Sequence, residues 1–512
     1  MLFANLPEDV LWYILATNFD RDSHTLAVLA LLSKRFNRIT TPILYAHVTL
    51  GLDEADESRK VRRFIMSVFS SPYLAQCVRS LELNQLSWSS HQSLSRRRVE
   101  LVERMKTGNV LGRPDRLDMF KLVTVVRRLP LLDTHKRKWC TELQEVAPSL
   151  DSLIALAFVF LPSLEKLESN WSQDPAFIWH MLPQTDTKKV EPSPTPLVLK
   201  SLTHLKINSE SPCGDSSEIL PFLHMPSLTH FFASNWGPIK RDGLEAGGDL
   251  QAVSPASSAS SLSLDSGRGL TVSPIAHLEL RHCHFDLFSL RTIVRRCRSV
   301  RTFIFHRDWD PRVSVRLSGK SIIHALYPLM DTLENIALSF EPGLYLHQEG
   351  EISPLDFSHF PVLTSIHVAA GYLVHNPDDF DSSESSDYRD SQDRRRAVDI
   401  PLYDRLPESL EVLRITGFST LAQAQFLIDD CYRVLQHRDR FPRLRELSIE
   451  APFDDPNTAF DTKALHREAR RADVLLRKID NTDTFDDDYD LFTDAGYNWG
   501  MNGEFRWGTK LF

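Results

Sequence analysis

Several features that mark secreted, membrane-spanning or nucleic-acid-binding proteins are lacking in this sequence. Its 512 residues include six cysteines at scattered positions, which is typical of reduced thiols in a cytoplasmic or nuclear protein. The formal net charge of −9 offers no general basic face, so we expect no nucleic-acid partner. The longest apolar run, Leu153 to Leu161, is too short to span a bilayer, and we expect no membrane partner. Glu8 and Asp9 stand where a secretory signal would carry lysine or arginine.

The sequence also has little that indicates catalysis or metal binding. The segment from Gly319 to Ser321 ends like a phosphate-binding loop, but the position of the required earlier glycine is Ser314. The segment from His282 to His284 has metal-binding residue types, yet adjacent side chains of a strand alternate faces and no second ligand pair follows. This favours a core role for Cys283. We therefore expect a non-catalytic protein without cofactor or metal.

The first fifty residues carry a pattern that predicts three short helices. Pro7 suits a first helical turn, where its missing N–H needs no partner. Asp22 or Ser23 can cap a second helix, which is predicted to carry Leu26, Leu29, Leu32, Ser33 and Phe36. The Thr41-Pro42 pair is typical of a third helix start. The first helix has one apolar stripe, formed by Val10, Leu11, Ile14 and Leu15.

So small a unit carries more large apolar residues than its core can hide, among them Trp12 and Leu31. The excess predicts an exposed patch that another protein covers. The alternative is an ordinary helical hairpin packed on its own domain.

This stretch resembles the F-box family over residues 5 to 50. The resemblance is carried by Leu6-Pro-x-Asp9, the Ile14-Leu15 pair, Leu29, Leu32-Ser33-Lys-x-Phe36 and Leu44-Tyr45. In that family the three helices bind the small Skp adaptor of a cullin ubiquitin ligase. The resemblance therefore implies adaptor contacts from Leu6, Pro7, Leu11, Ile14, Leu15, Leu29, Leu32, Ser33 and Phe36.

A second pattern recurs ten times through the rest of the chain. Each copy spaces apolar residues by three, which fits a turn or helix, and most end with a spacing of two, which predicts a short strand. A clear copy is Leu199-x-x-Leu202-x-x-Leu205-x-Ile207. Because helical segments separate the copies, we expect parallel strands stacked as a solenoid. The copies have strand positions at Leu81, Leu167, Leu205, Phe231, Leu278, Phe303, Ile336, Ile366, Leu413 and Leu447.

This pattern resembles leucine-rich repeats, although only the copy from Ile275 to Phe285 carries the fuller signature. The predicted fold is therefore α/β, with an N-terminal three-helix F-box followed by an irregular leucine-rich-repeat solenoid of parallel strands with helices on the outside. A non-solenoid α/β fold with leucine-rich helices is the alternative.

The predicted domains are an F-box-like module at 1–50, a solenoid at 51–456, and a helical cap with an acidic and aromatic tail at 457–512. Two segments of biased composition, near 253–274 and 377–399, are predicted to be disordered insertions. Helices are predicted at Leu122 to Leu129, Leu143 to Phe160 and Thr462 to Ile479.

Together these features predict a substrate-recognition subunit of a Skp–cullin–F-box ligase, in the cytoplasm or nucleus. The head would bind the Skp adaptor and, through it, a cullin; the solenoid would bind an unknown substrate protein. Two alternatives stay open: a scaffold or assembly protein that uses the same modules without degradation, and an enzyme with a site hidden in the middle. The outward strand positions predicted to contact substrate are Lys206, Asn208, Glu279, Arg281, His306, His367 and Arg414.

Overall fold

The computed structural model describes residues 6–19, 22–50, 57–83, 116–145, 148–171, 176–179, 181–182, 198–209, 214–239, 273–307, 317, 319–340, 354–373, 400–417, 421–451 and 462–480. The predicted insertion at 377–399 and the acidic and aromatic tail lie outside these residues, as does the insertion at 253–274 apart from its last two positions. The chain divides into two compact units. Unit 1 comprises Met1–Leu317 and His324–Leu333, and unit 2 comprises Ser318–Ile323 and Glu334–Phe512.

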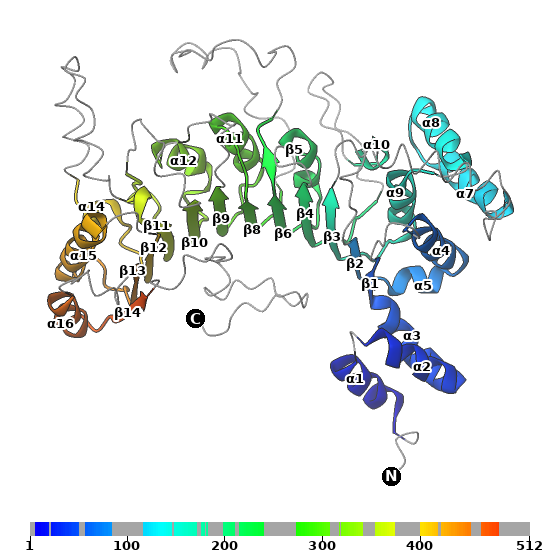
Figure 1. Cartoon of the computed structure of the whole chain (residues 1–512), viewed down its shortest axis with the longest axis horizontal. Coiled ribbons are helices and arrows are strands. Elements are labelled where there is room, and N and C mark those ends of the chain that lie inside the picture. The colour runs from blue at the N-terminus through cyan, green and yellow to red at the C-terminus, as the bar shows by residue number, and fades with distance from the viewer. Residues whose placement is uncertain are drawn as a thin grey trace. The chain divides into compact units, whose positions relative to one another are not determined.

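Unit 1 contains a ladder of seven strands, which pair in parallel and lie side by side in chain order (Figure 1). The strands are β1 (His47–Thr49), β2 (Ser80–Leu83), β3 (Lys166–Trp171), β4 (His204–Ser209), β6 (His230–Ser234), β8 (His277–Arg281) and β9 (Thr302–Arg307). Two further short strands, β5 (Gly214–Asp215) and β7 (Trp236–Gly237), pair with each other.

The strands begin with the same hydrogen-bond arrangement. The N–H groups of Thr203 and His204 both donate to the carbonyl of Glu165, over 2.8 and 3.0 Å. One repeat later, the N–H groups of Thr229 and His230 donate to the carbonyl of Thr203 in the same way. Since a shared carbonyl recurs at successive strand starts, the spacing pattern in the sequence corresponds to one repeated local structure.

The apolar positions of this pattern form the core, as the sequence predicted. Leu205, Phe231, Leu278 and Phe303 are matched across four neighbouring strands and are all fully buried. In β4 the buried Leu205 and Ile207 alternate with half-buried polar residues, which is the period-two signature of a strand with one face in the core, whereas every residue of β8 is buried. Cys283, predicted as a core residue, is also fully buried.

Helices account for most of the remaining described residues of unit 1. After the first three helices come α4 (Glu57–Ser70), α5 (Pro72–Cys77), α7 (Arg116–Arg128), α8 (Asp133–Gln144), α9 (Leu150–Phe160), α10 (Ala176–Trp179) and α11 (Leu287–Arg296), with 3-10 turns η2 (Ser216–Ile219), η3 (Phe222–His224) and η4 (Tyr327–Leu329). The single helix predicted from Leu143 to Phe160 is wrong. The helix α8 ends at Gln144, and a separate helix, α9, begins at Leu150. Ser149 caps α9 by accepting a hydrogen bond from the N–H of Ser152.

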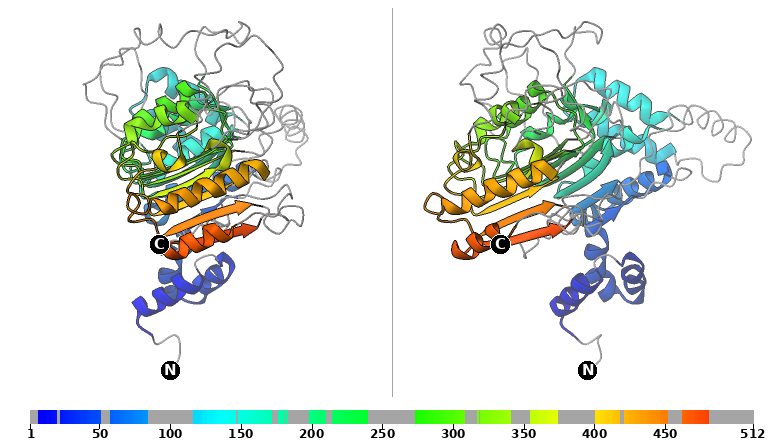
Figure 2. Two further views of the ribbon diagram at one scale, coloured as in Figure 1. Left: turned by 90° about the vertical axis from the view of Figure 1, so that its left-hand side faces the viewer. Right: turned by 60° about the vertical axis from the view of Figure 1, so that its left-hand side comes forward.

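Unit 2 contains five further strands, again paired in parallel and in chain order. They are β10 (Asn335–Phe340), β11 (Ser365–Ala369), β12 (Val412–Thr416), β13 (Glu446–Ala451) and β14 (Leu475–Asp480). Its helices are α14 (Leu402–Arg405), α15 (Leu421–Gln436) and α16 (Lys463–Arg471), with the 3-10 turn η6 (Ala370–Tyr372), while α12 (Gly319–Leu326) has residues in both units. Figure 2 shows α15 and α16, coloured orange and red, alongside the last two strands.

Among the described residues, the ladders of the two units hold seven and five parallel strands, and β5 and β7 form a separate parallel pair, so the chain is an α/β protein. The end of unit 2 differs from the prediction of a helix from Thr462 to Ile479. The helix α16 ends at Arg471, and β14 follows after a turn in which Asp473 has a positive φ of 53°. None of the described helices has the length and apolar character needed to cross a membrane.

Candidate functional site

The first candidate site is the N-terminal helical module, formed by α1 (Glu8–Asn18), α2 (Ser23–Leu32) and α3 (Lys34–Ala46). The side chain of Asp22 caps α2 by accepting from the N–H of Thr25 over 2.9 Å. Ser33 caps α3 by accepting from the N–H of Phe36 over 3.2 Å. These caps satisfy backbone donors that have no partner within their own helices, so they fix where the helices start.

Two predicted details of the module are wrong. A helical run was expected to reach Phe36, and a third helix was expected to begin at the Thr41-Pro42 pair. The cap at Ser33 instead ends the second helix early, and Pro42 lies inside α3. The number of helices, three, agrees with the prediction.

The core of the module is small. Its fully or nearly fully buried residues are Leu11, Leu15, Leu26, Ile39 and Ile43. Glu8 on α1 pairs with Arg35 over 3.6 Å and also with Arg38, and both arginines belong to α3. Since these ion pairs are largely exposed, the five apolar residues provide most of the stabilisation.

The surface of the module carries large apolar side chains. On α2, Val28, Leu31 and Leu32 are exposed at i, i+3 and i+4, the spacing of a single helix face. Leu31 is 86% exposed and Leu32 is 63% exposed. On α1, Val10, Trp12 and Tyr13 are also exposed. Apolar residues that are exposed in a row on one helix are typical of a surface that another molecule covers.

The predicted adaptor contacts divide between this surface and the core. Leu32, Pro7 and Ser33 are exposed, whereas Leu6, Ile14, Leu29 and Phe36 are half-buried. Leu11 and Leu15 are buried within the module, so their side chains are core residues in this structure. In the sequence analysis Trp12 and Leu31 appeared only as excess apolar residues, and Tyr13 and Val28 had no predicted role. The spacing of apolar residues does not show which face of a short helix packs against the core and which stays exposed.

The second candidate site is the polar strand face, defined as the alternate residues of β3, β4, β6 and β8 that point away from the apolar core. The strand register places three residues from each strand in three rows. The rows are Lys166, His204, His230 and His277; Glu168, Lys206, Phe232 and Glu279; and Asn170, Asn208, Ser234 and Arg281.

Neighbouring side chains on this face pair with each other across the strands. Lys206 Nζ lies 2.5 Å from a carboxylate oxygen of Glu168 and 5.5 Å from the ring centre of Phe232. Asn208 donates to Asn170 over 3.0 Å and accepts from the hydroxyl of Ser234 over 2.9 Å. These cross-strand contacts fix the side chains in position.

The β8 part of this face is buried. Glu279 is 1% exposed, accepts a hydrogen bond from Arg281 and lies 3.3 Å from Nε2 of His277. A buried carboxylate is costly unless it has charged or hydrogen-bonding partners, and here Glu279 has two. The predicted contacts Glu279 and Arg281 lie on the polar strand face, but both are buried in this structure.

Two rings of the histidine row, those of His204 and His230, are neutral at neutral pH. His204 and His230 stack with ring centres 4.3 Å apart, and His277 follows 5.6 Å further along. Burial, followed by nearby cationic and histidine groups, lowers the pKa of His204 to about 4 and that of His230 to about 3.

The hydroxyls of the preceding threonines fix the tautomers of two of these rings. The Thr203 hydroxyl donates to the carbonyl of Glu165, so Nδ1 of His204, 2.8 Å away, must donate to that hydroxyl. The same reasoning applies to Thr229 and His230. Both rings are therefore protonated at Nδ1 and present Nε2 as an acceptor.

The other predicted substrate contacts belong to the strands β9, β11 and β12. His306 on β9 is half-buried, and its ring lies 4.9 Å from that of His282. In unit 2, burial lowers the pKa of His367 to about 4, and Arg414 pairs with Glu446 over 2.9 Å. The register places His367 opposite Arg414. The predicted contacts thus form one cluster in unit 1 and another in unit 2.

Within the described residues, no group of three or more histidine, cysteine or acidic side chains could hold a metal ion. Comparisons with known proteins do not assign the chain to a family. No family model matches the chain, and no curated protein matches it. The resemblance to F-box proteins with leucine-rich repeats rests on the residues quoted above and stays a prediction.

Proposed function

We propose that the chain is the substrate-recognition subunit of a Skp–cullin–F-box ubiquitin ligase. In this proposal the N-terminal helical module is an F-box that binds the Skp adaptor, and the parallel strands form an irregular leucine-rich-repeat solenoid that binds a substrate protein. The chain itself would break or form no bond. It would raise the rate of ubiquitin transfer by holding the substrate close to a charged carrier on the other subunits.

The observation that carries the proposal is the exposed apolar face of α2. Leu31 and Leu32 are exposed on a module whose core is only five residues, where each of them would gain stability from burial. A partner helix or groove that covers this face would supply that burial. The F-box resemblance names the Skp adaptor as that partner.

The polar strand face supports the second half of the proposal. It presents hydrogen-bonding groups on rigid strands, and cross-strand contacts such as Asn170 to Asn208 hold them in fixed positions. Side chains held in this way lose little conformational entropy when they bind another protein. We expect substrate contacts at the half-buried members, Lys206 and Asn208, before the buried Glu279.

Binding of the full-length chain to purified Skp adaptor tests the first half. Leu31→Asp combined with Leu32→Asp should abolish co-purification, because two charges would enter the apolar interface. Leu475→Asp is the matched control, since Leu475 is an exposed leucine of β14 in unit 2. Full binding by the double variant, with the control also binding, would contradict the proposal.

Co-purification of a cullin distinguishes a ligase subunit from a scaffold that uses the adaptor alone. The same Leu31→Asp and Leu32→Asp variant should accumulate substrate, because it would hold the substrate without presenting it for ubiquitin transfer. A protein captured by this variant, whose cellular level falls when the wild-type chain is expressed, would be the substrate. Adaptor binding without any cullin would favour the scaffold.

A further inference from the structure

A basic and apolar tip joins α7 to α8 in unit 1. We define the α7–α8 tip as the residues from Arg127 to Lys138. Leu132 is the residue immediately before α8, where it caps no backbone group with its side chain and is 67% exposed. Serine, threonine, aspartate or asparagine would stabilise the helix at that position. Helix stability therefore does not explain a leucine here.

Cationic side chains flank this leucine on both helices. Arg127 and Arg128 are exposed in the last turn of α7, and Arg137 and Lys138 are exposed near the start of α8. Within the tip, Lys136 pairs with Asp133 over 3.6 Å. The tip thus concentrates positive charge in a chain whose formal net charge is −9.

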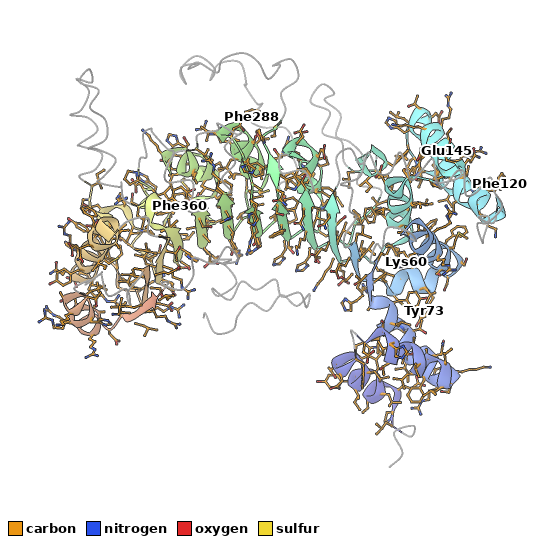
Figure 3. The ribbon with its side chains drawn as sticks, in the orientation of Figure 1. Lys60, Tyr73, Phe120, Glu145, Phe288 and Phe360 are labelled. Atoms are coloured by element: carbon orange, nitrogen blue, oxygen red, sulfur yellow. The ribbon has the colours of Figure 1, made fainter. Side chains whose placement is uncertain are left out.

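The rest of the hairpin holds the tip in place. Trp139 follows the basic run directly, is buried, and donates a hydrogen bond to the carbonyl of Ser152 on α9 over 3.0 Å. Cys140 is buried against α7, where its thiol lies 3.9 Å from the carbonyl of Val123. Phe120 and Glu145, labelled in Figure 3, lie on α7 and just after α8, towards the ends of the two helices that are remote from the tip. The presentation of Leu132 between two basic helix ends is therefore built into the fold.

We propose that the α7–α8 tip binds an anionic lipid surface. Basic side chains are attracted to acidic headgroups, and an exposed leucine between them can enter the boundary between headgroups and acyl chains. A nucleic acid, or an acidic protein segment without apolar side chains, would use the cations but would leave Leu132 in water. A lipid surface offers acidic headgroups and an apolar layer together, so we favour it as the partner. The contact is peripheral and needs no membrane-spanning segment, but it departs from the expectation, drawn from the sequence alone, that the chain has no membrane partner.

Flotation of the full-length chain with vesicles tests this proposal. Vesicles of phosphatidylcholine with phosphatidylserine should bind the chain, vesicles of phosphatidylcholine alone should not, and binding should weaken at high salt. Each basic residue removed should weaken binding about fivefold. Arg127→Glu combined with Arg137→Glu should therefore abolish measurable binding, whereas Arg467→Glu with Arg470→Glu on α16 should leave it unchanged.

Leu132→Ser separates lipid binding from simple attraction to anions. This variant improves the cap of α8 and should fold, yet it should bind the phosphatidylserine vesicles several-fold more weakly than wild type. Absence of vesicle binding by the wild-type chain would overturn the proposal. So would undiminished binding by Leu132→Ser together with displacement by heparin, which would indicate an acidic macromolecule as the partner instead.

Discussion

The N-terminal helical module and the parallel strands of unit 1 use apolar residues in opposite ways. The strands bury their inward apolar positions, such as Phe231 and Leu278, and many of their alternate positions carry polar groups that pair with one another. The module buries five apolar residues and leaves Leu31 and Leu32 largely exposed. The strand region therefore buries its apolar residues within the chain itself. The module leaves apolar residues exposed, as expected of a surface that another molecule covers.

The largest test of this contrast compares a strand residue with a module residue. Phe231 is fully buried between Leu205 and Leu278 on the neighbouring strands. Phe231→Ala should lower the free energy of unfolding by about 3–5 kcal/mol, because it removes buried surface and leaves a cavity. Leu31→Ala should change it by less than about 0.5 kcal/mol, because Leu31 is exposed.

Urea unfolding followed by far-ultraviolet circular dichroism measures both values. If Leu31→Ala lowered the free energy of unfolding as much as Phe231→Ala, the α2 face would be part of a folded core and the contrast between the two regions would be wrong. In the presence of a saturating partner, Leu31→Ala should become costly as well. That change would mark the exposed leucine as an interface residue.

A second test compares a buried carboxylate with a half-exposed one on the polar strand face. Glu279→Gln should destabilise the chain by about 3 kcal/mol, because it leaves the buried guanidinium of Arg281 without its charged partner. Glu168→Gln should cost less than about 1 kcal/mol, because the Lys206–Glu168 pair is partly exposed and screened by solvent. Thermal unfolding of both variants checks the difference, and equal costs would mean that burial does not set the strength of these pairs.

The regular part of the fold was predictable from the sequence because each repeat carries its own local signal. The ten predicted strands correspond to β2, β3, β4, β6 and the six from β8 to β13, with the predicted apolar positions buried. The short pair β5 and β7 was not predicted, and neither were β1 and β14, the first and last described strands along the chain. β1 is only three residues long, and β14 follows a helix whose periodicity hides the change to period two.

The candidate sites were less predictable, because burial by distant residues leaves no local signal. The sequence placed Leu11 and Ile14 among the adaptor contacts, and in the structure the first is a core residue and the second is half-buried. Alternation correctly predicted that Glu279 and Lys206 lie on one strand face. It could not predict that the first is buried and the second half-buried, because both occupy the same strand position, in repeats that are separated by β6.

A third and smaller effect on stability is expected at Ser33. The F-box resemblance places Ser33 among the adaptor contacts, whereas in the structure its side chain caps α3. Ser33→Ala should cost about 1 kcal/mol, because the N–H of Phe36 loses its acceptor. Hydrogen exchange at the first turn of α3 measures this loss. Ser33→Asp keeps a capping oxygen, so it should restore the protection of the first turn of α3 against hydrogen exchange. Any loss of adaptor binding by Ser33→Asp would then come from the lost contact of the serine with the adaptor and not from the lost cap.

The smallest expected effect is the pH dependence that the histidine row gives to the strands. Because burial lowers the pKa of His204 to about 4 and of His230 to about 3, the folded chain resists protonation that the unfolded chain accepts near pH 6.5. Their contribution to stability is complete above pH 6.5 and is lost as the pH falls towards 4. Both rings are partly exposed, so solvent screening should limit the loss to less than about 1 kcal/mol for each.

The variant with His204→Asn and His230→Asn isolates that contribution. Its free energy of unfolding should fall less steeply than that of the wild type between pH 6.5 and 4.5, and the two slopes should agree between pH 7 and 8. Carboxylates also titrate in the acidic range, but they titrate in both proteins and so cancel in the difference. An unchanged slope would mean that the polar strand face admits a charged imidazole without cost. The face would then resemble the open surface of the helical module, and the contrast between the two regions would rest on their apolar residues alone.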